Sequence, residues 1–482
     1  MDETMKPMAD ERVENAKSDI YDEGLISTAE EQRLTKRLLW KMDSRILPIL
    51  ALLFLCSFID RTNVGNVKIL GLQASLRITD HQFAIGLCAF YATYILSEIP
   101  SNLLLRTISP RIWLPLLTAV WGTLTMCLGF TTNFASFVAV RALLGFVEGG
   151  LLPGMILYLT AFYTRTELAV RIGIFYTAAS LSGAFGGLLA RGLSAIGPAG
   201  GLEGWRWVLV IEGLLTVACG LICSIFLPNS ISSARFLSPA QKDLALSRLH
   251  SSAHATEHFA WSEVRRGILN VQVWLSASSY FAILSGLYSF GLFLPTIINS
   301  LSFVHDANAA QLWSVIPYAV AAFFTVCTAL LSDRLRLRGV IMLFTLPIAI
   351  IGYGVISRST NAKVQYGMTF LMATGLYSSV PCVLVWNSNN SAGHYKRATT
   401  SGLQLAVANA GGFVASFIYP GKEKPTFTRS HEIILGLLCA SWLLVAANVA
   451  WCAKINRDKR RGRYAEFEGS GDDRDPEFKM VL

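Results

Sequence analysis

Long apolar stretches recur along almost the whole chain and limit what it can fold into. An α-helix needs about 20 predominantly apolar residues to cross the hydrocarbon layer of a bilayer. Stretches of this kind cover residues 45–64, 82–105, 112–131, 134–162, 168–194, 206–227, 271–299, 311–331, 339–357, 364–386, 399–420 and 431–453. We therefore expect an all-α membrane protein with twelve transmembrane helices.

The composition agrees with this expectation. Only 15% of the residues are charged, against about 25% in soluble domains. The nine cysteines lie inside or at the edges of apolar stretches, so they predict neither a metal site nor a disulfide framework. The formal net charge is +9, but in a membrane protein the position of Lys and Arg relative to the spans matters more than their sum. We expect no cofactor, no metal and no nucleic-acid partner.

Polar segments divide the chain into five parts. These are an N-terminal tail (1–44), a six-helix bundle (45–227), a linker (228–270), a second six-helix bundle (271–453) and a C-terminal tail (454–482). Lys and Arg cluster in both tails and in the linker. Because the cytoplasmic segments of membrane proteins are enriched in these residues, we expect both termini and the linker in the cytoplasm.

The first span ends in an unusual group of polar residues. Asp60 and Arg61 are adjacent, and Asn63 follows three residues after Asp60. Neighbouring side chains point about 100° apart around a helix, so Asp60 and Arg61 cannot simply neutralise each other. Because ionisable groups inside a membrane face a cavity or a partner, we expect these residues to face the protein interior. The alternative is that Asp60 lies at the outer interface in contact with water.

The fourth span carries Arg141 and Glu148. They are seven residues apart, close to two helical turns, and so share a face. Gly145 and Gly149 form a small-xxx-small pair that lets another helix approach closely, and Pro153 permits a bend. A purely structural bridge between Arg141 and Glu148 is the alternative, although its geometry is poor.

These charged residues predict coupled transport. Arg61 and Arg141 stay protonated and can hold a carboxylate with two hydrogen bonds. Burial can drive Asp60 and Glu148 toward their neutral forms, so each can carry a proton. A proton carrier beside a fixed cation can move an anion together with protons. The spans contain no nucleophile with a base and no metal cluster, so we do not expect an enzyme.

Other polar residues are weaker candidates. Tyr91 in the second span is a candidate for the substrate pocket, and Glu98 in the same span is a candidate loop latch. Asn387 and Asn390 at the end of the tenth span either bind the anion from the second half or hold helices together.

Two loops and four segments resemble a known family. The loop after the eighth span, with Asp333, Arg334 and Arg338, resembles the loop signature of the major facilitator superfamily, whereas the loop after the second span keeps Arg106 and lacks the Asp. Residues 60–66, 141–154, 204–207 and 386–390 together resemble the anion:cation symporter family of that superfamily, and most closely its fungal allantoate, nicotinate, biotin and pantothenate permeases.

The resemblance implies a major facilitator fold of two six-helix halves and proton-coupled import of a small organic anion. It implies Asp60 and Glu148 as proton sites, Arg61 and Arg141 as anion contacts and Asn390 as a further substrate contact. It also favours the plasma membrane, with a monomer as the default. An exporter of a metabolite or drug on the same fold remains the strongest alternative, and a transporter-derived nutrient sensor is another. The sequence does not identify the anion.

Overall fold

The computed structural model describes residues 28–252, 261–470 and 472–482. Most of the predicted N-terminal tail and part of the predicted linker lie outside this range. The described chain is helical and contains no strand, which confirms the all-α fold class.

The first bundle is built from seven helices that fall on the first six predicted spans. They are α2 (Thr28–Val67), α4 (Asp80–Thr107), α5 (Pro110–Leu128), α6 (Phe134–Glu148), α7 (Leu151–Thr160), α8 (Arg165–Ser194) and α9 (Gly204–Phe226). A π-helical segment, η1 (Lys68–Leu72), and the short α3 (Gln73–Leu76) continue α2. Three short 3₁₀ segments are η2 (Ala199–Gly201), η3 (Gly421–Glu423) in the second bundle and η4 (Ala465–Phe467) in the C-terminal tail.

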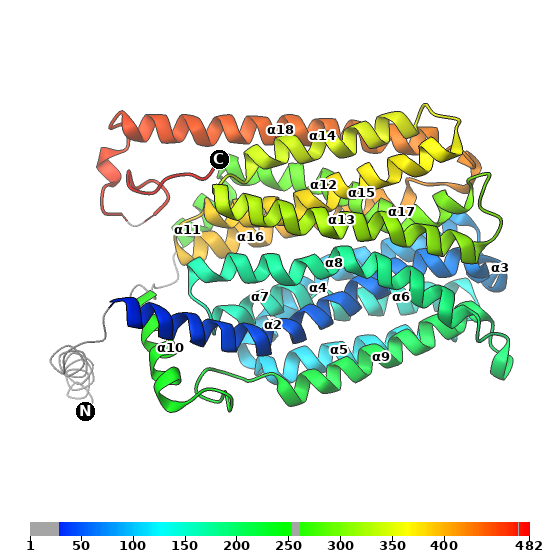
Figure 1. Ribbon diagram of the computed structural model, residues 1–482, viewed down its shortest axis with the longest axis horizontal. Coiled ribbons are helices and arrows are strands. Elements are labelled where there is room, and N and C mark those ends of the chain that lie inside the picture. The colour runs from blue at the N-terminus through cyan, green and yellow to red at the C-terminus, as the bar shows by residue number, and fades with distance from the viewer. Residues whose placement is uncertain (1–27, 253–260, 471) are drawn as a thin grey trace.

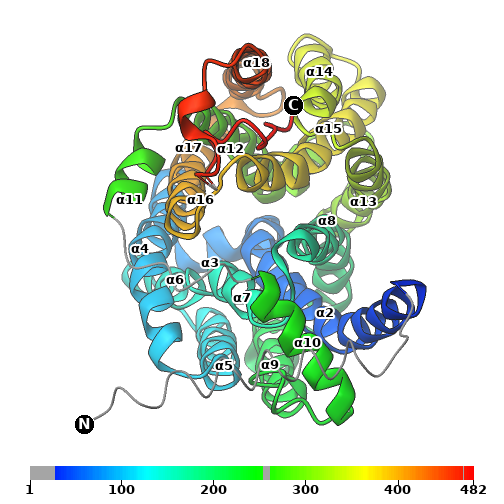
Figure 2. The ribbon, with the colours of Figure 1, turned by 90° about the vertical axis from the view of Figure 1, so that its left-hand side faces the viewer.

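The second bundle follows two linker helices, α10 (Pro239–Ser252) and α11 (Trp261–Ile268). It contains α12 (Val271–Asn299), α13 (Ala307–Leu335), α14 (Gly339–Ile356), α15 (Ala362–Asn389), α16 (His394–Asn409), α17 (Gly411–Phe417) and α18 (Thr428–Arg460). Figure 1 shows the two bundles side by side, with α5 and α9 at one edge and α14 and α18 at the other. In Figure 2, α10 and α11 lie at the end of the molecule where α2 begins and α18 ends, which we call the terminal end. We call the opposite end the distal end.

Hydropathy separates these helices into two groups. Nine helical segments of the described chain are long and apolar enough to cross a membrane. The other three predicted spans correspond to α4, α8 and the pair α16–α17, which pack against the apolar helices. The predicted boundaries are mostly correct to within a few residues. The main exception is α2, which begins at Thr28 rather than near residue 45, because Leu38 and Met42 give its polar first half a buried face.

The fourth predicted span is broken between α6 and α7 at Gly149 and Gly150. Glycine is a poor helix former, and Pro153 follows in the first turn of α7. Gly145 and Gly149 pack directly on α4, where a Cβ atom would overlap the carbonyl oxygens of Phe90 and Tyr94. The close approach that the glycine spacing predicts is therefore present.

Substituting Gly145 with Val is expected to destabilise the first bundle. The added side chain must displace the α4 backbone, and overpacking of this kind typically costs about 1–3 kcal/mol. The matched control is Gly192→Val in α8, because a Cβ atom at Gly192 meets no other atom within 4 Å. Thermal unfolding of the purified variants measures the effect. Equal melting temperatures for the two variants would show that the α4–α6 contact is not tight.

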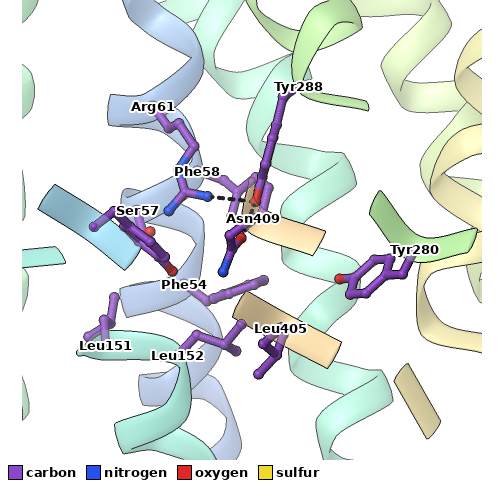
Figure 3. Close-up of a pocket in the computed structure, with 11 residues that line it drawn as sticks. Phe54, Ser57, Phe58, Arg61, Leu151, Leu152, Tyr280, Tyr288, Leu405 and Asn409 are labelled. Carbon is purple, nitrogen blue, oxygen red and sulfur yellow. Dashed lines mark hydrogen bonds between the residues drawn. The ribbon is translucent and has the colours of Figure 1, made fainter. Parts of the chain in front are cut away.

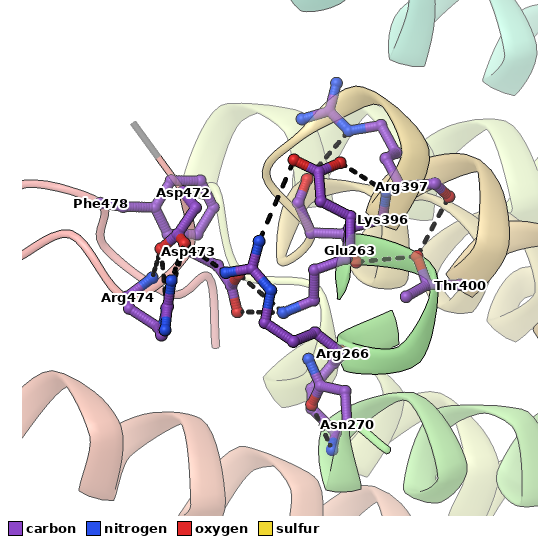
Figure 4. Close-up of polar contacts among 12 residues, drawn as sticks. Glu263, Arg266, Asn270, Lys396, Arg397, Thr400, Asp472, Asp473, Arg474 and Phe478 are labelled. Carbon is purple, nitrogen blue, oxygen red and sulfur yellow. Dashed lines mark hydrogen bonds and ion pairs between the residues drawn. The ribbon is translucent and has the colours of Figure 1, made fainter. Parts of the chain in front are cut away.

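The C-terminal tail folds back onto the terminal end of the second bundle (Figure 4). The Lys396 Nζ atom lies 2.6 Å from the Asp473 carboxylate, and Arg266 of α11 lies 2.5 Å from that of Asp472. Further along, the backbone of Val481 exchanges two hydrogen bonds, of 2.7 and 2.9 Å, with the Asn390 side chain. The tail therefore ties the linker, α15 and α16 together.

The docked tail is expected to withstand moderate acid. Asp472 is partly desolvated, which opposes ionisation, but hydrogen bonds from Arg474 and Arg266 outweigh this and lower its pKa. A carboxylate whose pKa is lower in the folded state contributes stability above its unfolded pKa, about 3.9, and loses it only as the pH falls toward the folded value. Hydrogen exchange at Val481, corrected for intrinsic rates, should thus stay constant from neutral pH down to about pH 4.

The Asp472→Asn variant should lose this protection at neutral pH, whereas Glu468→Gln, at an exposed position, should retain it. Equal protection in both variants would show that the Asp472 ion pairs do not hold the tail.

Candidate functional site

A narrow cavity lies between the two bundles (Figure 3). The first bundle contributes residues of α2, α4 and α7, and the second contributes residues of α12 and α16. The lining consists of Phe54, Ser57, Phe58, Arg61, Tyr94, Leu151, Leu152, Tyr280, Tyr288, Leu405 and Asn409. It is mostly apolar and aromatic, with a single charged side chain, so any ion bound in it would meet Arg61.

Arg61 is the centre of the polar contacts in this cavity. Its side chain is only 5% exposed, and one guanidinium nitrogen lies 2.5 Å from Glu148 Oε1. The same oxygen accepts a hydrogen bond of 2.6 Å from the Ser57 hydroxyl. The guanidinium also lies 4.9 Å from the ring centre of Tyr94, within the range of a cation–π interaction. A buried cation is thus neutralised by one carboxylate and surrounded by rings.

The polar contacts continue into the second bundle. Arg61 donates a 3.2 Å hydrogen bond to the Tyr288 hydroxyl, which in turn donates a 2.9 Å bond to Asn409 Oδ1. Asn409 also lies within hydrogen-bonding reach of Glu98 on α4. Sequence reasoning missed Asn409. An amide in the middle of the eleventh predicted span is the signal that could have found it. Glu98, expected near the loops, instead lies at the interface of the bundles.

Arg141 is also buried, but no carboxylate among the described residues pairs with it. Its guanidinium lies 4.7 Å from the ring centre of Phe90. It forms no ion pair within the part of the chain that the structure describes. Glu148 pairs with Arg61 on α2 and not with Arg141 on its own span, so the structural bridge within the fourth span is not formed.

Asp60 points away from the cavity. Its carboxylate accepts hydrogen bonds of 3.3 and 3.4 Å from the hydroxyls of Thr125 on α5 and Thr216 on α9. Asn63, on the same face of α2, donates a 2.7 Å bond to Glu212 of α9. The angle of about 100° between neighbouring side chains explains this, because it directs Arg61 into the cavity and Asp60 into the first bundle. The polar group of the first span faces the protein interior, but only Arg61 lines the cavity.

Tyr91 lines a second cavity beside the first. Arg61, Tyr288 and Tyr377 line the same space, and the rings of Tyr91 and Tyr288 are 5.2 Å apart. The Tyr91 hydroxyl is buried and has no hydrogen-bond partner among the described residues. It is therefore available to a molecule bound near Arg61.

The structure does not bring Asn387 and Asn390 to the cavity. Asn387 donates a 3.1 Å hydrogen bond to the Thr400 carbonyl oxygen, and the Asn390 amide is fully engaged by Val481 of the tail. Both residues hold segments of the second bundle together, which is the alternative that the sequence left open. No contact with the cavity residues remains to support a substrate role for either.

The loop motif lies at the terminal end. Arg338 forms an ion pair with Asp333 and donates a 3.0 Å hydrogen bond to Ser332, whereas Arg334 is exposed. The side chain of Arg106 lies outside the described part of the structure.

Comparison with known proteins identifies the family. The family model of the Major Facilitator Superfamily matches residues 50–416. The chain belongs to the Major Facilitator Superfamily. A relative from Schizosaccharomyces pombe, named uncharacterized transporter C11D3.18C, is 34% identical over 466 residues, which is 95% of this chain and 93% of that protein. The high-affinity nicotinic acid transporter of Saccharomyces cerevisiae is 28% identical over 461 residues, 93% of this chain and 85% of that protein.

Solved structures agree on the fold. A bacterial homologue of the human lysosomal transporter Spinster, in an inward-facing and occupied conformation, aligns with a TM-score of 0.64 at 17% identity, covering 84% of this chain and 97% of that one. A D-xylose–proton symporter aligns with a TM-score of 0.64 at 15% identity, covering 83% and 96%. This chain is thus a multi-pass membrane transporter with the Major Facilitator fold and not an enzyme.

Proposed function

We propose that this transporter imports a small organic anion together with protons, as members of the anion:cation symporter family do. The observation that carries the proposal is the Arg61–Glu148 pair: Arg61 lines a cavity formed by both bundles, and Glu148 neutralises it. Arg61 supplies a permanent positive charge, because arginine stays protonated in proteins. Glu148 supplies a charge that a proton can remove.

The pair can exchange its partners. A substrate carboxylate that reaches Arg61 competes with Glu148 for the same guanidinium nitrogens. Protonation of Glu148 removes its negative charge and frees Arg61 for the substrate, so binding of the anion and of a proton favour each other. Arg141, without an ion pair in the described structure, is a second contact for the anion. Asp60 serves as a further proton site.

The cavity lies on the terminal side of a closed interface. Thr62 and Gly65 of α2 pack on Gly291 and the Leu292 carbonyl group of α12, distal to Arg61. Phe54, Leu152 and Leu405 line the cavity on the terminal side of Arg61. With both termini in the cytoplasm, the closed contact lies on the outer side of the cavity in an alternating-access cycle. We place the protein in the plasma membrane as a monomer.

The gate at the terminal end involves two polar groups. The Asp333–Arg338 pair holds the α13–α14 loop, and the Arg338 backbone nitrogen donates a 2.7 Å hydrogen bond to Leu482 of the tail. Glu98 reaches Asn409 across the bundle interface. We assign gating to these residues, because Glu98 and Asn409 lie on opposite bundles and the Asp333–Arg338 pair fixes a loop at the terminal end.

The aromatic lining favours a small aromatic or heterocyclic acid. Tyr94, Tyr280 and Tyr288 combine flat apolar faces with hydroxyl groups. The similarity to a nicotinic acid transporter supports the same substrate class. We therefore choose nicotinate as the first probe.

Transport by purified protein in lipid vesicles tests the function. Radiolabelled nicotinate, other monocarboxylates and dicarboxylates should be compared with neutral nicotinamide, at two outside pH values. We expect uptake of at least one carboxylate, stronger at the acidic pH, and no uptake of nicotinamide. Uptake of the neutral amide in preference to every acid would contradict the proposal.

A further inference from the structure

A second pair of acidic side chains lies inside the first bundle, outside the cavity. The side chains of Asp60 on α2 and Glu212 on α9 are buried, and hydrogen bonds link their helices on both sides: Asn63, three residues after Asp60, donates to Glu212, and Thr216, four residues after Glu212, donates to Asp60. We propose that Asp60 and Glu212 share one proton and form a proton-binding site behind the anion site. This inference rests on the proposed function, because it identifies the partner with which Asp60 holds its proton.

The hydrogen bonds of the pair leave room for one proton. One oxygen of Asp60 accepts from Thr125 and Thr216, and one oxygen of Glu212 accepts from Asn63. The remaining oxygens, Asp60 Oδ1 and Glu212 Oε2, are buried and lack partners among the described residues. Two ionised carboxylates can only accept hydrogen bonds, but a single proton on one of them makes a bond that satisfies both oxygens.

The surroundings of the pair supply no direct counter-ion. Within the described chain, no Lys, Arg or His side chain donates a hydrogen bond to either carboxyl group. Two neighbouring carboxylates in a buried site repel each other, and the nearest cation, Arg141, forms an ion pair with neither of them. A proton shared by the two groups removes this repulsion.

The helices around Asp60 differ in the polar and charged side chains that they place near it. Helix α5 presents Trp121 and Thr125, and α9 presents Thr216 and Cys219 beside Glu212. Helix α6 contributes the two charged neighbours, Arg141 and Glu148. Helix α12 carries no charged residue, and α8 carries its charged residues only near its ends.

The shared proton determines how Arg141 is used. Arg141 is an electrostatic neighbour of both Asp60 and Glu148, yet it forms an ion pair with neither. While the pair holds its proton, Asp60 attracts Arg141 only weakly, and Arg141 remains available to the anion. Loss of the proton would turn the pair into an anion that competes with the substrate for Arg141. The pair thus couples its protonation to anion affinity through a residue that the substrate also contacts.

Infrared spectroscopy tests the shared proton without a substrate. Protonated carboxyl groups have a C=O stretching band that is separate from those of carboxylates and amides. In Glu212→Gln, the new amide donates a hydrogen bond to Asp60, which then ionises, so the difference from the wild-type protein at neutral pH should show the loss of a protonated carboxyl group. Asp60→Asn should show the same loss. The exchanged variant Asp60→Glu/Glu212→Asp should keep the band.

The control is Glu432→Gln, which removes an exposed carboxyl group and should leave the band unchanged. A band of wild-type intensity in either single variant would overturn the proposal. In vesicles, Glu212→Gln should lose proton-driven accumulation of nicotinate and keep nicotinate exchange; accumulation equal to wild type would also overturn it. If the wild-type protein moves no carboxylate, the proposed function fails, while the infrared result still decides whether the pair shares a proton.

Discussion

Replacing Glu148 with Gln is expected to reduce proton-driven accumulation of the anion to the level of protein-free vesicles, while exchange of anion across the membrane continues. Gln has nearly the same shape and can still accept hydrogen bonds from Ser57 and Arg61, which both bind Glu148 Oε1. It cannot bind or release a proton in this pH range. Arg61 is then permanently free for the anion, so transport no longer responds to the proton gradient. Radiolabelled nicotinate in vesicles, with and without an inward proton gradient, measures both activities.

The matched control is again Glu432→Gln, whose carboxylate forms an exposed ion pair with Arg358 at 3.3 Å. This variant should accumulate nicotinate like the wild-type protein. Unchanged accumulation in Glu148→Gln would show that Glu148 carries no transported proton.

Replacing Arg61 with Lys is expected to weaken anion binding by about ten- to hundred-fold. Arg61 uses two different nitrogens to reach Glu148 and Tyr288 on opposite bundles, whereas a lysine ammonium is a single point of charge. The variant keeps the charge but loses a hydrogen bond to a charged group, which is worth about 1.5–3 kcal/mol, and each 1.4 kcal/mol corresponds to about ten-fold in affinity. Equilibrium binding of nicotinate measures the change.

Arg358→Lys provides the control, because the Arg358 side chain is 81% exposed and does not line the cavity. It should bind nicotinate with wild-type affinity. Wild-type affinity in Arg61→Lys as well would mean that the fork geometry of Arg61 does not hold the anion.

Most of the fold could be predicted because the bilayer imposes a strong constraint on sequence. A span must be long and apolar, and the predicted span 271–299 coincides with α12 (Val271–Asn299). The start of α2 at Thr28 was missed, because its first half lies in a polar segment and hydropathy alone does not detect an amphipathic helix.

The site was predictable in part. Charged residues in apolar spans must find partners, and this singled out Arg61 and Glu148, which the structure joins. The same rule does not say which partner each residue finds. Tyr288 and Asn409 come from the other half of the chain, and the sequence does not indicate that they meet Arg61.

The direction in which each side chain points was harder to predict. Asp60 and Arg61 are both charged residues of the first span, but Asp60 points into the first bundle and Arg61 points toward the second bundle. Likewise, the sequence predicts Asn390 as a substrate contact. In the structure, both the nitrogen and the oxygen of its amide form hydrogen bonds with Val481, 91 residues later.

The most direct test of the central claim is proton uptake on substrate binding. Nicotinate is added to purified protein in a weakly buffered solution, and a pH indicator reports the protons taken up per nicotinate bound. If the anion displaces Glu148 from Arg61, the wild-type protein should take up protons as nicotinate binds, and Glu148→Gln should bind nicotinate with little or no uptake. Binding of nicotinate to the wild-type protein without proton uptake, or equal uptake by both proteins, would contradict the account.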